Sequence, residues 1–228
     1  FVILMLLHTL DHFLKRRYVR YPLRVWVSLI LAVLFCLLTL FTGFILKGDK
    51  EAVFAGRIFM NILQTVPAVG IPLSRLFIRS GEDFFFLPYL YHCFFLPLLI
   101  IYLIRGHTRE WFPDKGFMTA GVVGLFLYAF WIQPDPAIPP GAMVESVKGP
   151  WFFLGIQTLL KFLPPLMAGI IIPGLVLMGV FILPLTSGKR RADDGGGVHL
   201  KTDWFRYTIL ALIVIYGAFT LKAAIWGI

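Results

Sequence analysis

Long uninterrupted runs of apolar residues are the feature that most constrains how this chain can fold. A helix that crosses a bilayer needs roughly 20 consecutive apolar residues. Charged residues make up 14% of the chain, whereas soluble domains carry about a quarter. The sequence therefore predicts an all-α, polytopic transmembrane helix bundle in which Phe1–Leu14 is a partial helix. The further spans, about five, are Val25–Leu46, Phe84–Ile104, Phe117–Ile132, Leu163–Leu185 and Tyr207–Ile228.

Basic residues are distributed unevenly between the two sides of this predicted bundle. If the segments alternate in direction, thirteen lysines and arginines lie on one side and seven on the other. Cytoplasmic loops of membrane proteins carry the excess of basic residues, so we assign the more basic side to the cytoplasm or its equivalent. Topology then explains the net charge of +9. Lipid surrounds such a chain, and no nucleic-acid partner is expected.

Three polar or mildly apolar segments connect the predicted spans. Ala52–Leu76 contains apolar residues and two prolines, which indicates short helices that lie along the membrane interface. Gln133–Trp151 holds five prolines and is expected to form a stiff, turn-rich loop. Ser187–Gly197 has the composition of a flexible linker.

Histidines in or beside the apolar runs are the first candidates for chemistry, because ionisable residues within a membrane indicate function. His92 and His107 are 15 residues apart, which in a helix is roughly 22 Å of rise and about 60° of rotation. They therefore share one face, one near each membrane surface. Neutral imidazole is a standard axial ligand of haem iron. Two stacked haems are one interpretation, and an interfacial His107 with a hydrogen-bonded His92 is the other.

A third histidine favours the haem interpretation. His8 lies in Phe1–Leu14 at a depth comparable to that of His107, and we expect antiparallel packing of the two helices to place the two imidazoles opposite each other. His12 is one turn nearer the membrane surface, and we expect it to be solvated.

Six motifs follow one another along the chain: MLLHTLDHFLKRRYVRYPLRVW, FTGFIL, TVPAVGIPL, YHCFFLP, PDPAIPP and KGPWFFLGIQTLLKFLPP. Within the first of them, His8 precedes Trp26 by 18 residues. In their order and spacing the six motifs resemble the cytochrome b subunits of Rieske–cytochrome b complexes, both the mitochondrial and the chloroplast kind, and the 18-residue interval is that of the chloroplast kind. The resemblance runs through nearly the whole chain.

This resemblance implies one or two b haems as cofactors. His8 and His107 would ligate the iron of the high-potential haem on the cytoplasmic side, and His92 would ligate that of the low-potential haem on the other side. The second ligand of that haem would lie upstream of Phe1. The chain is therefore expected to be N-terminally incomplete, so that missing N-terminal helices or further membrane subunits supply this ligand.

Three residues of the third helix of the family bear on haem binding. Gly43 corresponds to a glycine that gives room to a haem. Leu29 stands where the family has a second such glycine, which is a departure from the pattern. Arg24 is expected to pair with a haem propionate, or else to act only as a surface cation that sets the topology.

The same resemblance implies a quinol-binding site at Gly149, Pro150, Trp151 and Phe152. The family has Pro-Glu-Trp-Tyr here, and Pro150 stands in the place of its glutamate. Oxidation of a quinol releases protons that need an acceptor. Glu145 is the nearest carboxylate and our candidate for this catalytic role, the alternative being a solvated loop residue.

Three parts of the chain follow from the resemblance. Residues 1–116 resemble the haem-binding N-terminal part of cytochrome b, residues 117–186 its C-terminal part with the quinol-site loop, and residues 187–228 are a polar linker with the last transmembrane helix. The chloroplast kind divides the first two parts between two chains, whereas this chain is a fusion of both.

The function implied is that of the electron-transfer subunit of a proton-translocating quinol:cytochrome c, or plastocyanin-like acceptor, oxidoreductase. Quinol would be oxidised on the non-cytoplasmic side, and electrons would cross the membrane through b haems. The expected partners are a Rieske-type iron–sulfur protein and a c-type cytochrome, in a homodimeric complex of a bacterial cytoplasmic membrane or an equivalent energy-transducing membrane.

Two other functions compete with this one. A haem-free membrane scaffold or transporter subunit that retains the fold is favoured by Leu29 and by the lost loop glutamate. A cytochrome b of another bis-histidine class, such as a formate dehydrogenase or hydrogenase anchor, explains the histidines but not the PDP and GPWFF motifs.

Overall fold

The computed structural model describes residues 2–108, 114–131, 139, 149–186 and 203–226. This part of the chain consists of helices and their connections, without a strand, which confirms the predicted all-α class. The α-helices are α1 (Val2–Leu14), α2 (Leu23–Leu46), α3 (Lys50–Gln64), α4 (Gly70–Phe77), α5 (Phe86–Leu90), α6 (Leu96–Ile104), α7 (Lys115–Trp131), α8 (Leu154–Leu159), α9 (Ile172–Thr186) and α10 (Asp203–Trp226).

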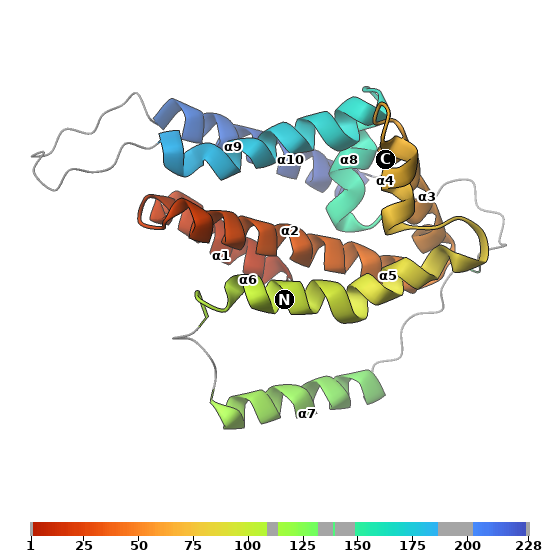
Figure 1. The fold of residues 1–228 in the computed structure, drawn as a ribbon, viewed down its shortest axis with the longest axis horizontal. Coiled ribbons are helices and arrows are strands. Elements are labelled where there is room, and N and C mark those ends of the chain that lie inside the picture. The colour runs from red at the N-terminus through yellow and green to blue at the C-terminus, as the bar shows by residue number, and fades with distance from the viewer. Residues whose placement is uncertain (1, 109–113, 132–138, 140–148, 187–202, 227–228) are drawn as a thin grey trace, which may run out of the picture.

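Four helical stretches in the described residues are long and apolar enough to cross a membrane. They are Leu23–Leu46, Gly81–Ile104, Met167–Thr186 and Phe205–Ile225. The fifth expected span, α7, is a shorter apolar helix, and so is α1. In Figure 1, α7 stands apart from the other helices, and its described side chains are exposed. The prediction of a polytopic bundle is confirmed, with α7 shorter than the four full spans.

Prolines interrupt two of the spans in the same way. A proline inside a helix has no N–H for the preceding turn, and its ring clashes with the carbonyl four residues earlier. A π-helical turn, Tyr91–Phe95, precedes Pro97, and another, Met167–Ile171, precedes Pro173. Such turns are wider than an α-helix and are frequent at functional sites. His92 lies in the first of them.

Helices α3 and α4 run across one end of the bundle, which Figure 1 shows at its right-hand side. Asp49 begins α3 as its N-cap, since its carboxylate accepts a hydrogen bond of 2.8 Å from the backbone N–H of Ala52. The Asp49 carboxylate is buried and forms an ion pair with Lys47. The short helices predicted within Ala52–Leu76 are thus confirmed, and their crosswise direction suits a membrane interface.

Helix α2 is the centre of the bundle, because it packs against α1, α5, α6 and α9. Two apolar clusters form around its two halves. The first contains Phe13, Tyr18, Trp26, Ile30, Leu183 and Ile209. The second contains Phe41, Ile45, Ala55, Met60, Ile78 and Phe84.

A hydrogen bond joins α2 to α9 at a place that a proline creates. Pro184 lies inside α9 and leaves the carbonyl of Val180 without its usual helical donor. The indole Nε1–H of Trp26 donates to that carbonyl at 2.8 Å, and Trp26 is 2% exposed. Neither group has water available within a bilayer. The bond therefore satisfies two polar groups and fixes the position of α2 against α9.

We expect Trp26→Phe to lower the free energy of unfolding by about 1–2 kcal/mol, because it leaves the Val180 carbonyl unpaired in an apolar cluster. The measurement is unfolding in mixed detergent micelles. Trp131→Phe is the matched control, since Trp131 is 80% exposed. In a Pro184→Ala background the loss should shrink, because residue 184 then supplies an N–H to Val180. Equal losses for the two tryptophan variants would contradict the assignment.

Candidate metal centre

Three imidazoles gather at one end of the bundle. His8 and His12 lie on consecutive turns of α1, and His107 follows the end of α6. The ring centroid of His107 is 5.9 Å from that of His8 and 5.5 Å from that of His12, and the His8 and His12 centroids are 4.3 Å apart. One nitrogen of each ring lies within 4.8 Å of the others. The predicted approach of His8 to His107 is confirmed.

The helices that bring these histidines together run parallel, so the expected antiparallel packing of α1 and α6 is wrong. Leu4 and Ile100, from the earlier parts of the two helices, line one cavity, whereas Arg17 and Arg105, which follow their ends, line another. A parallel arrangement also follows from alternating spans, because one full span separates α1 from the span that ends in α6.

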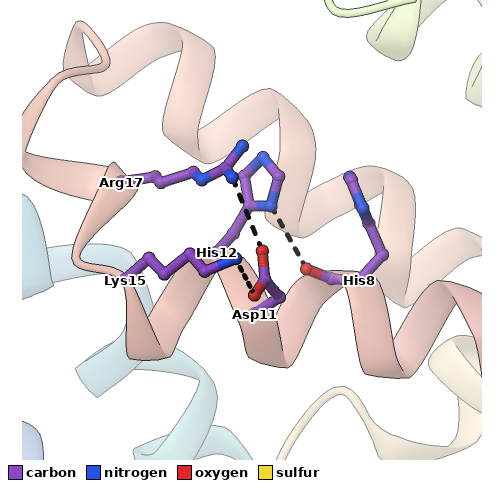
Figure 2. A network of polar contacts seen from close by, with 5 residues as sticks. All are labelled: His8, Asp11, His12, Lys15 and Arg17. Carbon is purple, nitrogen blue, oxygen red and sulfur yellow. Dashed lines mark hydrogen bonds and ion pairs between the residues drawn. The ribbon is translucent and has the colours of Figure 1, made fainter.

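His12 is 5% exposed, so the expectation that it is solvated is wrong. Its Nδ1 lies 3.2 Å from the backbone carbonyl of His8, one helical turn earlier, as Figure 2 shows. A carbonyl oxygen only accepts hydrogen bonds, so Nδ1 carries the proton. The Nε2 of His12 is then a bare lone pair, buried and without a hydrogen-bond partner among the described residues. His8, by contrast, is exposed.

Basic residues surround the imidazoles. Arg17, Arg24 and Arg105 line the same cavity as the three rings. Figure 2 shows Asp11 on the same helix as His8 and His12. The Asp11 carboxylate forms ion pairs with Lys15 at 2.7 Å and with Arg17 at 3.6 Å. The surroundings of the imidazoles are therefore positive, which suits a ligand that carries anionic groups.

The pKa of His107 is lowered from its ordinary value. Burial is the main cause, and the nearby charges of His8 and Arg17 add to it. A lowered pKa keeps the imidazole neutral near pH 7, which is the form that binds a metal ion.

Two adjoining cavities flank the imidazoles. The first has a volume of about 910 Å³ and includes Arg17, Arg24 and Arg105 in its lining. The second has a volume of about 420 Å³ and is lined mainly by apolar side chains of α1, α2 and α6. The residues common to both linings are His8, His12, Leu29, His107 and Thr108.

This combination fits a b-type haem. An apolar space suits the macrocycle, arginines suit its two carboxylates, and imidazoles suit its iron. An imidazole nitrogen binds a first-row metal ion at about 2 Å, so two nitrogens that bind one ion from opposite sides are about 4 Å apart. The nitrogens of the three imidazoles lie within 4.8 Å of one another, which agrees with this separation. Leu29 lines both cavities, so this side chain, at the position where the resemblance predicts a glycine, lies in the space that a haem would use.

His92 lies against the other half of α2, remote from the three-imidazole cluster. Its Nδ1 is 2.9 Å from the carbonyl of Thr39, to which it donates, and 3.5 Å from Oγ1 of Thr42. The Nε2 of His92 is then the nitrogen free to bind a metal ion. A Cβ added to Gly43 would lie 2.5 Å from the His92 ring. In this structure Gly43 gives room to the imidazole itself, and its predicted role beside a haem stays a prediction.

The residues of the predicted quinol site lie near this second end. The N–H of Gly149 donates to Oε1 of Gln157 at 2.9 Å, and the carbonyl of Phe152 accepts a hydrogen bond of 3.3 Å from the hydroxyl of Tyr216. The Phe152 ring meets that of Phe44, the neighbour of Gly43, edge to face at 6.4 Å. The structure therefore brings this segment to the His92 end of α2.

The remaining residues of that site differ in exposure. Pro150 is buried, whereas Trp151 is 47% exposed. Glu145 lies outside the described residues, and its catalytic role stays a prediction.

Sequence reasoning placed His8 and His107 but missed His12 as a candidate ligand. The signal was present, because residues four apart in a helix lie on the same face. The histidines at positions 8 and 12 are therefore predicted to be neighbours on one face of the helix, whichever of the two faces the bundle.

The known family and the known proteins to which this chain is similar all bear the name cytochrome b. The family described as Cytochrome b(N-terminal)/b6/petB matches residues 1–122. Cytochrome b of Rickettsia typhi is 22% identical over 218 residues, which cover 78% of this chain and 54% of that protein. The menaquinol:cytochrome c reductase cytochrome b subunit of Geobacillus thermodenitrificans is 28% identical over 114 residues, 46% of this chain and 49% of that protein. Its Bacillus subtilis counterpart is 29% identical over 111 residues, with the same coverage. The chain spans about half the length of these relatives.

We expect Gly43→Ala to displace the His92 imidazole, since the added Cβ would lie 2.5 Å from the ring. The free energy of unfolding should fall by about 1–3 kcal/mol, as for other overpacked sites. His92→Ala should relieve most of this loss in a double-mutant cycle measured in detergent micelles. Gly121→Ala is the matched control, because a Cβ there meets no described atom within 4 Å. A fall in Gly43→Ala that His92→Ala leaves unchanged would contradict the contact.

Proposed function

Because this chain belongs to the Cytochrome b(N-terminal)/b6/petB family, we propose that it is the transmembrane electron-transfer subunit of a quinol:cytochrome c, or plastocyanin-like acceptor, oxidoreductase. The observation that carries the proposal is the approach of imidazoles from α1 and α6 within a cavity with an apolar interior and an arginine rim. A b haem bound there would supply reversible one-electron transfer. The residues of this chain would hold, orient and shield it.

Each part of the cavity has its own task in this proposal. His107 and a histidine of α1 would hold the iron. Arg24 and Arg105 lie on the rim and would pair with the carboxylates of the macrocycle. The apolar side chains of α1, α2 and α6 would exclude water, which lowers the energy needed to reorganise the surroundings when the charge changes.

A second haem site is proposed at His92. The hydrogen bond from its Nδ1 to the Thr39 carbonyl orients the ring, as outer-shell hydrogen bonds do for most metal-binding histidines. The other described histidines lie at the opposite end of the bundle, so a second imidazole for this site would come from outside the described residues.

Quinol oxidation is proposed at the same end of α2, on the non-cytoplasmic side. Phe152 lies against Phe44, and the exposed Trp151 offers an aromatic face to a flat quinol ring. Glu145 would accept a proton released on oxidation. Release of protons on this side, with electrons returned to the other, would couple electron transfer to proton translocation.

The proposed partners follow from this reaction. A Rieske-type iron–sulfur protein would take one electron and pass it to a c-type cytochrome, in a homodimeric complex of a bacterial cytoplasmic or equivalent energy-transducing membrane. Two relatives that bear the name of menaquinol:cytochrome c reductase cytochrome b subunit support this setting. The division into a haem-binding part, 1–116, a quinol-loop part, 117–186, and a last helix with its linker, 187–228, belongs to the same proposal.

We expect the complex purified with this chain to show the b-type band in the pyridine haemochrome assay, and His107→Ala to lose the haem of the α1–α6 site while the complex still assembles. The reason is that no other described histidine lies at the end of α6 to replace His107. His92→Ala is the matched comparison and should leave this site loaded. A complex without b-type bands would contradict the proposal, and so would a His107→Ala complex with unchanged haem content.

Leu29→Gly should raise the affinity of the α1–α6 site for haem, because the side chain that lines both cavities is removed. Titration of haem into the depleted protein measures this change. Leu34→Gly is the control, because it lowers the stability of the helix by the same amount, about 1 kcal/mol. Leu34 does not line either cavity. If both variants bound haem equally, Leu29 would not be an obstacle.

A further inference from the structure

We propose that His12 is an alternative ligand of the haem, so that either His8 or His12 would bind its iron together with His107. This inference rests on the proposed function, because it concerns which residue of α1 completes the site. The resemblance to cytochrome b assigns that role to His8 by spacing, whereas the structure offers two imidazoles for it.

Distance alone does not separate the two histidines. Ring centroids lie 5.9 Å from His107 for His8 and 5.5 Å for His12, with the rings inclined by 62° and 70°. One nitrogen of each ring lies within 4.8 Å of the nitrogens of the other two. A pair across one ion needs about 4 Å. Either ring would therefore reach an iron held by His107 with a small adjustment of its side chain.

The hydrogen bonding of His12 in this structure favours it as a ligand. Its Nδ1–H donates to the carbonyl of His8, which fixes the tautomer and leaves Nε2 as the ligand atom. That atom is buried and has no hydrogen-bond partner among the described residues. A metal-binding histidine typically donates its other N–H to a carbonyl in this way. Unpaired buried polar atoms are costly, so bonding of Nε2 to iron would remove that cost.

The two histidines of α1 compete for one position. The iron of a bound haem would be held by His107 together with one histidine of α1. His8 and His12 are one helical turn apart, about 5.4 Å along the axis. Both line both cavities, so each would face a macrocycle bound there.

The charges of the site decide between a haem and a bare metal ion. Three imidazoles at this spacing are also a ligand set for a divalent cation. Arg17, Arg24 and Arg105 line the same cavity, and they would repel such a cation while attracting the carboxylates of a haem. We therefore assign the third imidazole to haem.

The test uses the intact complex with His92→Ala as background, so that the spectra report the α1–α6 site. His8→Ala, His12→Ala and the double variant are compared by electron paramagnetic resonance and by haem content per chain. Each single variant is expected to keep a low-spin, bis-histidine haem. The double variant should lose the low-spin signal and lose affinity by more than the ~10–100-fold that removal of an outer-shell partner costs.

Several outcomes would overturn the inference. If His8→Ala loses the low-spin signal as completely as the double variant does, His8 is the sole ligand and His12 is only its neighbour. If the site holds a divalent ion without porphyrin, which metal analysis would reveal, the assignment to haem is wrong. Added imidazole should restore the low-spin signal of the double variant, which separates a lost ligand from a misfolded chain. If the parent complex holds no haem at this site, the proposed function itself fails.

Discussion

The absence of water inside a bilayer is the constraint on which the rest of this structure depends. Every polar group between the apolar helices must find a partner in the protein. Trp26 meets this demand for the carbonyl that Pro184 leaves free in α9. His92 meets it through the carbonyl of Thr39. In His12 only one of the two ring nitrogens is paired within the described part of the chain. Nδ1 is bonded to the His8 carbonyl, whereas Nε2 has no partner among the described residues. This buried nitrogen belongs to a residue that lines both cavities, where it is available to bind a ligand.

The two halves of helix α2 lie beside two separate candidate sites, one at each end of the bundle. Its first half carries Arg24 and Leu29 beside the imidazoles of α1 and His107, and its second half carries Gly43 and Phe44 beside His92 and the segment from Gly149 to Phe152. One continuous helix thus sets the distance between two candidate redox positions. The π-turn at Tyr91–Phe95, which precedes Pro97, places His92 against α2 at the second of them.

The sequence predicted the architecture well and the site in part. Apolar runs identified the spans because their length has a direct physical meaning, and the motifs located the meeting of α1 with the end of α6. The parallel course of those helices could have been derived from the alternation of spans. The burial of His12 could not, because it depends on which way the face of a short helix turns, and depth along the helix does not specify this. Sequence also left Leu29 ambiguous. Its side chain lies in the lining of both cavities, which makes it an obstacle that can be tested.

The two interpretations of Arg24, a surface cation that sets topology and a partner for a haem carboxylate, do not exclude each other. The positive-inside rule gathers arginines at the cytoplasmic ends of helices, and the arginines that line the cavity at the ends of α1 and α6 lie on the side that the sequence assigns to the cytoplasm. A cofactor with anionic groups would then be drawn to this end by charges that topology already requires. The same charges disfavour a bare cation among the three imidazoles. In the proposed site, topology, cofactor choice and ligand choice would therefore share one electrostatic cause.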